Sequence, residues 1–133
     1  MIEYARGHRG AVVASLKANG GPAAAYLETA VTDDGEIVFD TMTTSRITGN
    51  VARDHRVAVV YGGSEGSTLQ CEGLAQRVEA DERSHYASAY LTAFPDYTLD
   101  EATSVLIRVK LTWAQFGDFG EDGYETHRID LPA

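Results

Sequence analysis

Two tight-turn sequences near the N-terminus constrain the fold of this chain more than any other feature. Asn19-Gly20 and Asp33-Asp34-Gly35 interrupt runs of small, branched and aromatic residues. A glycine after Asn or Asp supplies the positive φ angle that a short hairpin requires. We therefore predict an antiparallel meander of three strands, over residues 10–18, 23–32 and 36–41.

Strand and helix patterns alternate along the rest of the chain. Strand patterns cover residues 56–61, 67–78 and 104–113, and a further short strand is expected at 126–131. A short helix is expected from Ser45, as its N-cap, to Asp54, and a longer one from Asp81 to Phe94. No linker or internal repeat divides the sequence, so we expect one domain, residues 1–133. About six strands with short helices predict a small β-barrel.

The charge balance narrows the classes of partner. The chain has 11 Lys plus Arg against 20 Asp plus Glu, which gives a net charge of −9. A surface this acidic repels phosphate backbones and anionic lipids, and no basic cluster offsets it. We therefore expect no nucleic acid and no membrane as partners. The N-terminus lacks a basic segment leading into an apolar one, which favours a cytoplasmic protein.

The single cysteine and the four histidines do not indicate a metal or redox site. Cys71 lies in mid-strand among apolar residues, so we expect a buried thiol rather than a reactive one. The histidines are scattered, with no His-x-x-x-His pair, so no metal site is expected. The sequence also lacks a phosphate loop, a dinucleotide fingerprint and a nucleophile elbow, so no catalytic side chain is assigned.

One junction has the composition of an anion site. The strand predicted at 36–41 ends at Thr41, and Thr43, Ser45 and Arg46 lead into the short helix. A helix N-terminus presents unpaired backbone N–H groups, and the hydroxyls and the guanidinium add further donors. Together these groups suit a phosphate monoester. A capped helix start with an exposed arginine has the same composition, so the residues alone leave both interpretations open.

Four segments carry an ordered set of motifs: a Ser-Arg step, an Asn a few residues later, a strand, and a Glu-Gly-x-Ala strand. The segments are 41–46, 50–60, 68–75 and 113–119. In this order and spacing the chain resembles the pyridoxamine 5′-phosphate oxidase-like family of FMN-binding split barrels. The resemblance implies a mainly β (α+β) fold, a six-stranded antiparallel split β-barrel with short flanking helices. It also implies a homodimer with FMN at the subunit interface.

The resemblance further implies the residues of the cofactor site. They are Ser45 and Arg46 at the FMN phosphate, Thr41 and Thr43 along the ribityl chain and flavin edge, Asn50 on the helix beside the phosphate, Gln70 approaching the flavin from a strand, and Trp113 near the ring at the interface. Small residues at 23–25 would let the flat ring lie close to a strand. The family commonly has Lys or Arg after the Ser-Arg step, whereas this chain has Ile47.

The function implied is a flavin-dependent oxidoreductase acting on an unidentified small molecule. The family's Arg-x-His substrate element has no match in this sequence, so pyridoxamine phosphate itself is not the expected substrate. One alternative is a deazaflavin-dependent reductase, with Arg53 and Arg56 at an open exit for the acidic tail of that cofactor. Another is a non-catalytic flavin-binding, haem-binding or sensor protein.

Overall fold

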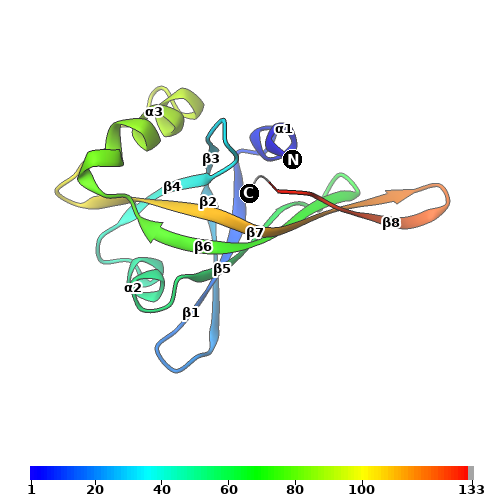
Figure 1. Ribbon diagram of the computed structural model, residues 1–133, viewed down its shortest axis with the longest axis horizontal. Helices are drawn as coiled ribbons and strands as arrows, with labels where there is room; N and C mark the ends of the chain where they lie inside the picture. The colour runs from blue at the N-terminus through cyan, green and yellow to red at the C-terminus, as the bar shows by residue number, and fades with distance from the viewer. Residues whose placement is uncertain (132–133) are drawn as a thin grey trace.

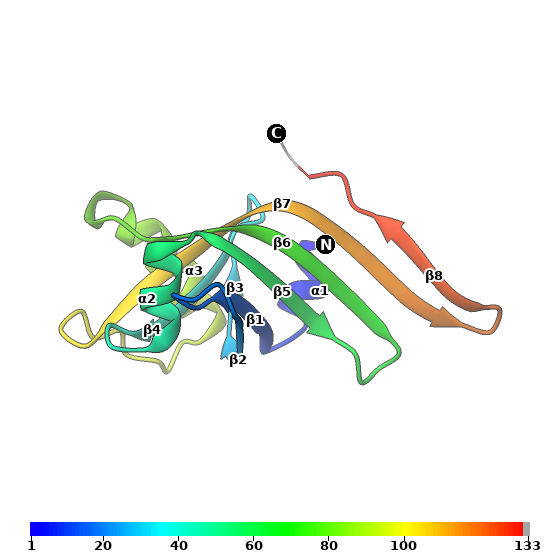
Figure 2. The ribbon, with the colours of Figure 1, turned by 90° about the horizontal axis from the view of Figure 1, so that it is seen from below.

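An antiparallel sheet curls through most of the chain and forms a split barrel, as the computed structural model in Figures 1 and 2 shows. The structure describes residues 1–131. Within them the strands are β1 (Gly10–Leu16), β2 (Pro22–Glu28), β3 (Ala30–Val31), β4 (Ile37–Met42), β5 (Arg56–Gly62), β6 (Ser67–Arg77), β7 (Ser104–Gly120) and β8 (Gly123–Arg128). The α-helices are α1 (Ile2–Arg6), α2 (Arg46–Arg53) and α3 (Arg83–Ala93). None of these helices is long and apolar enough to cross a membrane.

The barrel is split because the two end strands of its sheet, β2 and β3, are not hydrogen-bonded to each other. The sheet runs β2-β1-β5-β6-β7-β4-β3, and β8 pairs with β7. Only Thr29 separates β2 from β3 in sequence, yet they stand at opposite ends of this order. The predicted strand 23–32 is therefore two strands, because the chain changes partner from β1 to β4 at Thr29. The predicted meander is wrong in this respect, since β1 with β2 and β3 with β4 form two separate hairpins.

The split-barrel prediction is confirmed, but its count of six strands is too low. The described residues form eight strands, because the second strand is divided and the expected short strand near the C-terminus, β8, forms at Gly123–Arg128. The expected helix from Asp81 begins later: Asp81 lies in a short 3₁₀ turn, and α3 starts at Arg83. Helix α1 was not predicted at all. It has five residues, too few for a helical period to be recognised.

A β-bulge in β7 reverses the side of the sheet to which its residues point. Gly73 of β6 pairs with Leu111, whereas the neighbouring Glu72 pairs with Trp113, so Thr112 is the extra residue. Before the bulge, odd-numbered residues such as Ile107 and Val109 are buried, and after it the even-numbered Ala114 is buried. Trp113 consequently lies on the outer side of the sheet.

The interior divides into two clusters of apolar side chains. The larger fills the barrel and includes Phe39, Leu69 and Cys71, each almost fully buried. The expectation of a buried thiol at Cys71 is confirmed, and burial raises its pKa to about 12. The smaller cluster lies under α3, where Tyr86 and Tyr90 pack on residues of β3, β4 and β7.

The region just after α1 is fixed to the β5–β6 hairpin by a histidine with two acceptor partners. His8 Nδ1 lies 2.8 Å from the Tyr4 carbonyl oxygen, and Nε2 lies 2.5 Å from Glu65 Oε1. Both partners are acceptors, so the protonated ring, with a proton on each nitrogen, is the form that can make both hydrogen bonds. These two hydrogen bonds raise the pKa of His8, the Tyr4 carbonyl contributing most. The hydrogen bond from His8, together with weaker ones from other groups, lowers the pKa of Glu65 to about 2.

A pair of leucine truncations tests the placement of the core. Leu69 is 1% exposed and Leu91 is 36% exposed. Leu69→Ala should lower the free energy of unfolding by about 2–5 kcal/mol, because it removes buried methyl groups and leaves a cavity. Leu91→Ala makes the same chemical change near the surface and should cost much less. Urea denaturation of both variants measures the difference, and equal losses would contradict this core.

The His8–Glu65 pair should make stability depend on pH in a defined window. The raised pKa of His8 stabilises the fold fully below its ordinary value of 6.5, and this contribution is lost as pH rises through the raised pKa. The lowered pKa of Glu65 stabilises the fold above its ordinary value of 4.5, and this contribution is lost as pH falls towards 2. The free-energy difference between the wild type and His8→Gln should thus be largest at about pH 5–6 and shrink by about pH 9. His55→Gln, which makes the same substitution at an exposed histidine, is the control.

Candidate functional site

The strand-to-helix junction between β4 and α2 is closed by a chain of hydroxyl hydrogen bonds. Thr48 Oγ1 donates to the Met42 carbonyl oxygen at 2.7 Å, so it accepts from Ser45 Oγ, 2.9 Å away. Ser45 Oγ in turn accepts from Thr41 Oγ1 at 2.8 Å and from the Thr48 N–H at 3.4 Å. The predicted N-cap role of Ser45 is confirmed. Every hydroxyl proton of this chain already has an acceptor, so one of these hydroxyls can donate to an arriving anion only by giving up its present hydrogen bond.

Arg46 and Ile47 stand next to each other but face opposite environments. Arg46, the first residue of α2, is exposed, and no ion pair or hydrogen bond holds its guanidinium within residues 1–131. Ile47 is buried and packs with Val51 in the barrel core. The position that commonly carries a second cation in the family therefore points inward here. Arg46 is the one side-chain cation at the first turn of α2.

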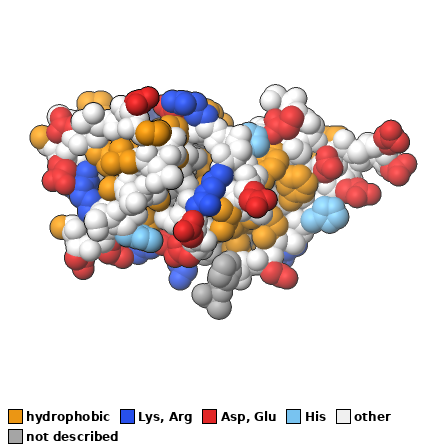
Figure 3. Space-filling model, turned by 90° about the horizontal axis from the view of Figure 1, so that it is seen from above, with side chains coloured by type: hydrophobic (Ala, Val, Ile, Leu, Met, Phe, Trp, Pro, Cys, Tyr) orange, Lys and Arg blue, Asp and Glu red, His pale blue; other side chains and the backbone are white. Residues whose placement is uncertain are grey.

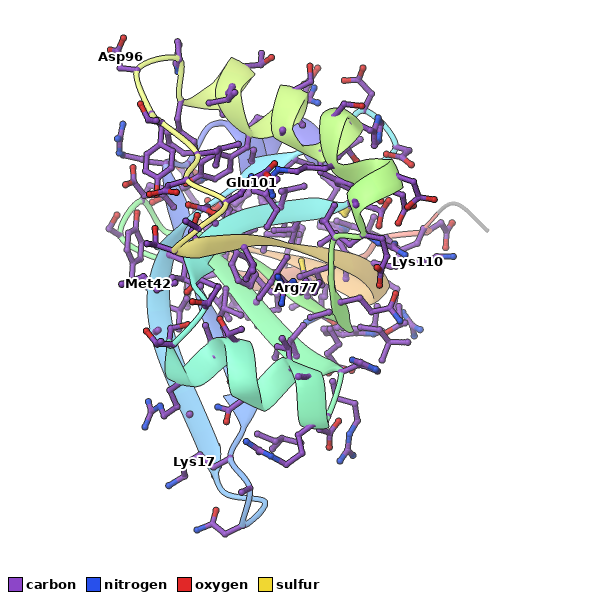
Figure 4. All side chains as sticks on the ribbon, turned by 90° about the vertical axis from the view of Figure 1, so that its left-hand side faces the viewer. Lys17, Met42, Arg77, Asp96, Glu101 and Lys110 are labelled. Atoms are coloured by element: carbon purple, nitrogen blue, oxygen red, sulfur yellow. The ribbon has the colours of Figure 1, made fainter. Side chains whose placement is uncertain are left out.

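Thr43 lies on the solvent side of this junction, whereas Asn50 lies on the buried side. Thr43 is exposed, and its N–H donates to the Thr103 carbonyl oxygen at 2.9 Å. Asn50 is 3% exposed, and its Nδ2 donates to Ser15 Oγ at 3.0 Å. Its side chain thus points towards β1 and holds α2 against the barrel. Figure 4 views this end of the molecule, with Met42 labelled at the end of β4 above α2.

Gln70 and Trp113 lie away from the junction, on the outer face of the sheet. Gln70, the fourth of the 11 residues of β6, is paired with Val60 and Gln115. Trp113 lies beside the bulge, and the Arg128 guanidinium stands 6.0 Å from its ring centre. The structure therefore brings together Thr41, Thr43, Ser45 and Arg46. It does not bring Gln70 and Trp113 to them within one chain.

The outer face that carries Gln70 and Trp113 also exposes apolar side chains, which we call the outer sheet face. They come from β1, β2, β5 and β6 and include Val12, Tyr26, Val60 and Leu74. The alanines at 23–25 lie on β2, at one edge of the sheet, where Ala24 and Ala25 are exposed. Apolar residues gathered on one face of a sheet indicate a binding or association surface.

Sequence reasoning missed two parts of this arrangement. Thr48 completes the hydroxyl chain, and its spacing of three residues from Ser45 at a helix start could have indicated this. The outward direction of the half-buried Trp113 could not be found, because simple alternation from Ile107 and Val109 places it in the core. Among the described residues, no group of three or more His, Cys, Asp or Glu side chains could hold a metal ion.

The fold and the junction together define a split barrel with a donor-rich helix start, and a family model identifies the class. The model described as pyridoxamine 5′-phosphate oxidase matches residues 3–116. The chain therefore belongs to the pyridoxamine 5′-phosphate oxidase family. Among curated proteins, none matched the sequence.

Solved structures share this fold at low sequence identity. A haem-binding protein from Mycobacterium smegmatis has a TM-score of 0.76 and 20% identity, over 96% of this chain and 57% of that one. A protein of unknown function from Agrobacterium tumefaciens has a TM-score of 0.72 and 22% identity, over 82% and 50%. A pyridoxamine 5′-phosphate oxidase-related, FMN-binding protein from Nostoc punctiforme has a TM-score of 0.71 and 13% identity, over 96% and 89%. The chain thus spans only about half the length of the first two.

The hydroxyl chain can be tested by removing its central member. Ser45→Ala deletes the N-cap acceptor and two hydrogen bonds, so it should destabilise the protein by about 1–2 kcal/mol. Thr44→Ala, at the exposed neighbouring position, should change the free energy of unfolding by less than about 0.5 kcal/mol. Thermal denaturation followed by circular dichroism measures both. Equal effects would show that the cap does not stabilise α2.

Proposed function

We propose that this protein binds FMN, with the phosphate at the Thr41–Arg46 junction, and acts as an oxidoreductase on a small molecule. The observation that carries the proposal is the start of α2. It presents first-turn N–H groups, three linked hydroxyls and an exposed, unpaired arginine, in a chain whose net charge is −9. An anion would be held there by local donors, against the overall field.

The residues present fit a phosphate monoester attached to a polar chain. Ser45 and Arg46 would hold the phosphate, and Thr41 and Thr43 would face the ribityl hydroxyls. Bound flavin would supply the electron and hydride chemistry, while the protein supplies binding and orientation. Asn50 would act indirectly, because its hydrogen bond to Ser15 fixes the helix whose N-terminus meets the anion.

A second copy of the chain belongs to this proposal. Gln70 and Trp113 lie on the outer sheet face, remote from their own junction, so they could meet a flavin only from a partner protomer. The exposed apolar residues of that face would be covered in such a dimer. A two-fold pair would form two equivalent flavin sites at one interface.

Haem is the second candidate ligand, because the structural neighbour from Mycobacterium smegmatis is a haem-binding protein. The absorbance spectrum of the purified protein separates the two, since flavin and haem absorb at different wavelengths. Titration with FMN, with a deazaflavin cofactor and with haemin then gives the relative affinities. If FMN binds no better than millimolar, or if turnover of reduced flavin does not exceed that of free flavin, the proposed function fails in binding or in catalysis respectively.

Arg46→Gln should weaken FMN binding by about ten- to a hundredfold. A charge-assisted hydrogen bond contributes about 1.5–3 kcal/mol, and no second cation at position 47 can replace it. Flavin fluorescence quenching measures the dissociation constant. Arg77→Gln is the matched control, since it removes the same charge from an exposed position at the end of β6. The phosphate assignment is wrong if both variants bind FMN equally.

A further inference from the structure

The β7–β8 hairpin extends beyond the body of the molecule and has no neighbour along its outer part. β6 accompanies β7 as far as Asp118, and the Phe119 N–H adds one more hydrogen bond, to the Gly66 carbonyl oxygen at 2.8 Å. Beyond it, residues 120–123 have only one another as partners. All six residues of β8 are exposed, and Figures 1 and 2 show the hairpin projecting at one end. An isolated two-stranded hairpin is marginally stable in water. We call this projecting hairpin the arm. Packing against another surface would stabilise it.

An aromatic pair marks the outer side of this hairpin. Phe119 and Tyr124 are cross-strand partners with ring centres 4.5 Å apart, and they are 68% and 45% exposed. Ala114 faces the core, so Phe119, an odd number of positions along β7, faces outward with Gln115. Tyr124 covers Gly117, where a Cβ would lie 2.0 Å from the Tyr124 hydroxyl. The pair is thus continuous with the outer sheet face.

A hollow of about 400 Å³ lies at the opposite end of the same face. It is lined mainly by small and apolar residues of β1, β2, β5 and β6, including Ala14, Leu16, Pro22, Ala58 and Leu74. The register aligns Arg56, Leu74 and Lys110 at this end, whereas Ser67 and Asp118 are aligned at the hairpin end. One face therefore carries a projecting aromatic pair and a recess at opposite ends of its strands.

The charges of the two ends are complementary. The hairpin carries Asp118, Glu121, Asp122 and Glu125, and no Lys or Arg occurs from residue 111 to residue 127. Figure 3 shows acidic side chains gathered at this end. The charged residues that line the hollow are Arg56, which pairs with Asp54, and Glu72. Two further cations stand beside it, since Lys17 follows the lining residue Leu16 and Lys110 is the register partner of Leu74. Arg53 reaches this region through its hydrogen bond to the Leu16 carbonyl oxygen.

We propose that the Phe119–Tyr124 pair inserts into the hollow of a second copy of this chain, with the acidic tip against the basic rim. The inference rests on the homodimer of the proposed function and specifies how its two copies meet. In a two-fold dimer the arm of each copy contacts the hollow of the other, so both aromatic pairs and both hollows are covered in one arrangement. A different partner would need one surface that fits the hollow and another that covers the aromatic pair.

Cross-linking between chains tests the arrangement directly. One chain carries Asp122→Cys and the other Lys17→Cys, and they are mixed with a short bis-maleimide reagent. Cys71 is buried, so it does not compete. A covalent dimer of the two variants is expected. Asp33→Cys replaces Lys17→Cys as the control, since Asp33 is fully exposed and lies in the turn after β3. No cross-link, or an equal yield with the control, overturns the proposal.

The dissociation constant of the dimer supplies the second test, with circular dichroism confirming that each variant folds. Phe119→Ser should raise this constant about tenfold or more, because the ring is exposed in one chain and buried in the pair. The double variants Glu121→Lys/Asp122→Lys and Lys17→Glu/Arg53→Glu should each dimerise weakly and associate with one another when mixed. Unchanged dissociation of Phe119→Ser, or no recovery on mixing, overturns the proposal.

FMN binding, read by absorbance, is independent of these measurements. A cross-linked dimer without FMN binding would contradict the proposed function and leave the arm-in-hollow contact standing. A dimer that binds FMN but gives no cross-link between residues 122 and 17 would do the reverse.

Discussion

The docking of α2 against one end of the barrel is the constraint on which the site depends. Ile47 and Val51 enter the core on one side of the helix, and Asn50 bonds Ser15 of β1. These contacts fix the helix axis, so its N-terminus stays open to solvent beside the end of β4. Ile47 points into the core, so the preceding residue, Arg46, lies on the solvent side of the first turn. A donor-rich helix start is therefore a by-product of how the barrel end is closed.

Local sequence patterns were sufficient for most of the fold. The turns at Asn19-Gly20 and Asp33-Asp34-Gly35, and the cap at Ser45, are encoded by a few neighbouring residues, and the structure confirms them. The change of partner at Thr29 is different, since it depends on which strands flank the segment in space. Alternation within a single strand carries no information about that choice. This is why one predicted strand became two.

The site was predictable in part for the same reason. Thr41, Thr43, Ser45 and Arg46 are close in sequence, so their grouping follows from one turn between a strand and a helix. Gln70 and Trp113 lie on other strands, and their distance from the junction depends on sheet order and on the bulge. The resemblance to the family suggested these residues, whereas the single chain separates them. Their roles in the flavin site remain predictions that require a second protomer.

The bulge at Thr112 has a consequence for how this surface could change during evolution. The additional residue in β7 reverses the face of the sheet to which each later residue of that strand points, from Trp113 onward. Loss of that residue would turn Trp113 and Phe119 towards the interior and bring Phe116 outward, with no other change in composition. A single codon thus decides whether Trp113 and Phe119 or Phe116 point outward from the sheet. Insertions and deletions at this point would therefore change which aromatic rings the outer sheet face carries.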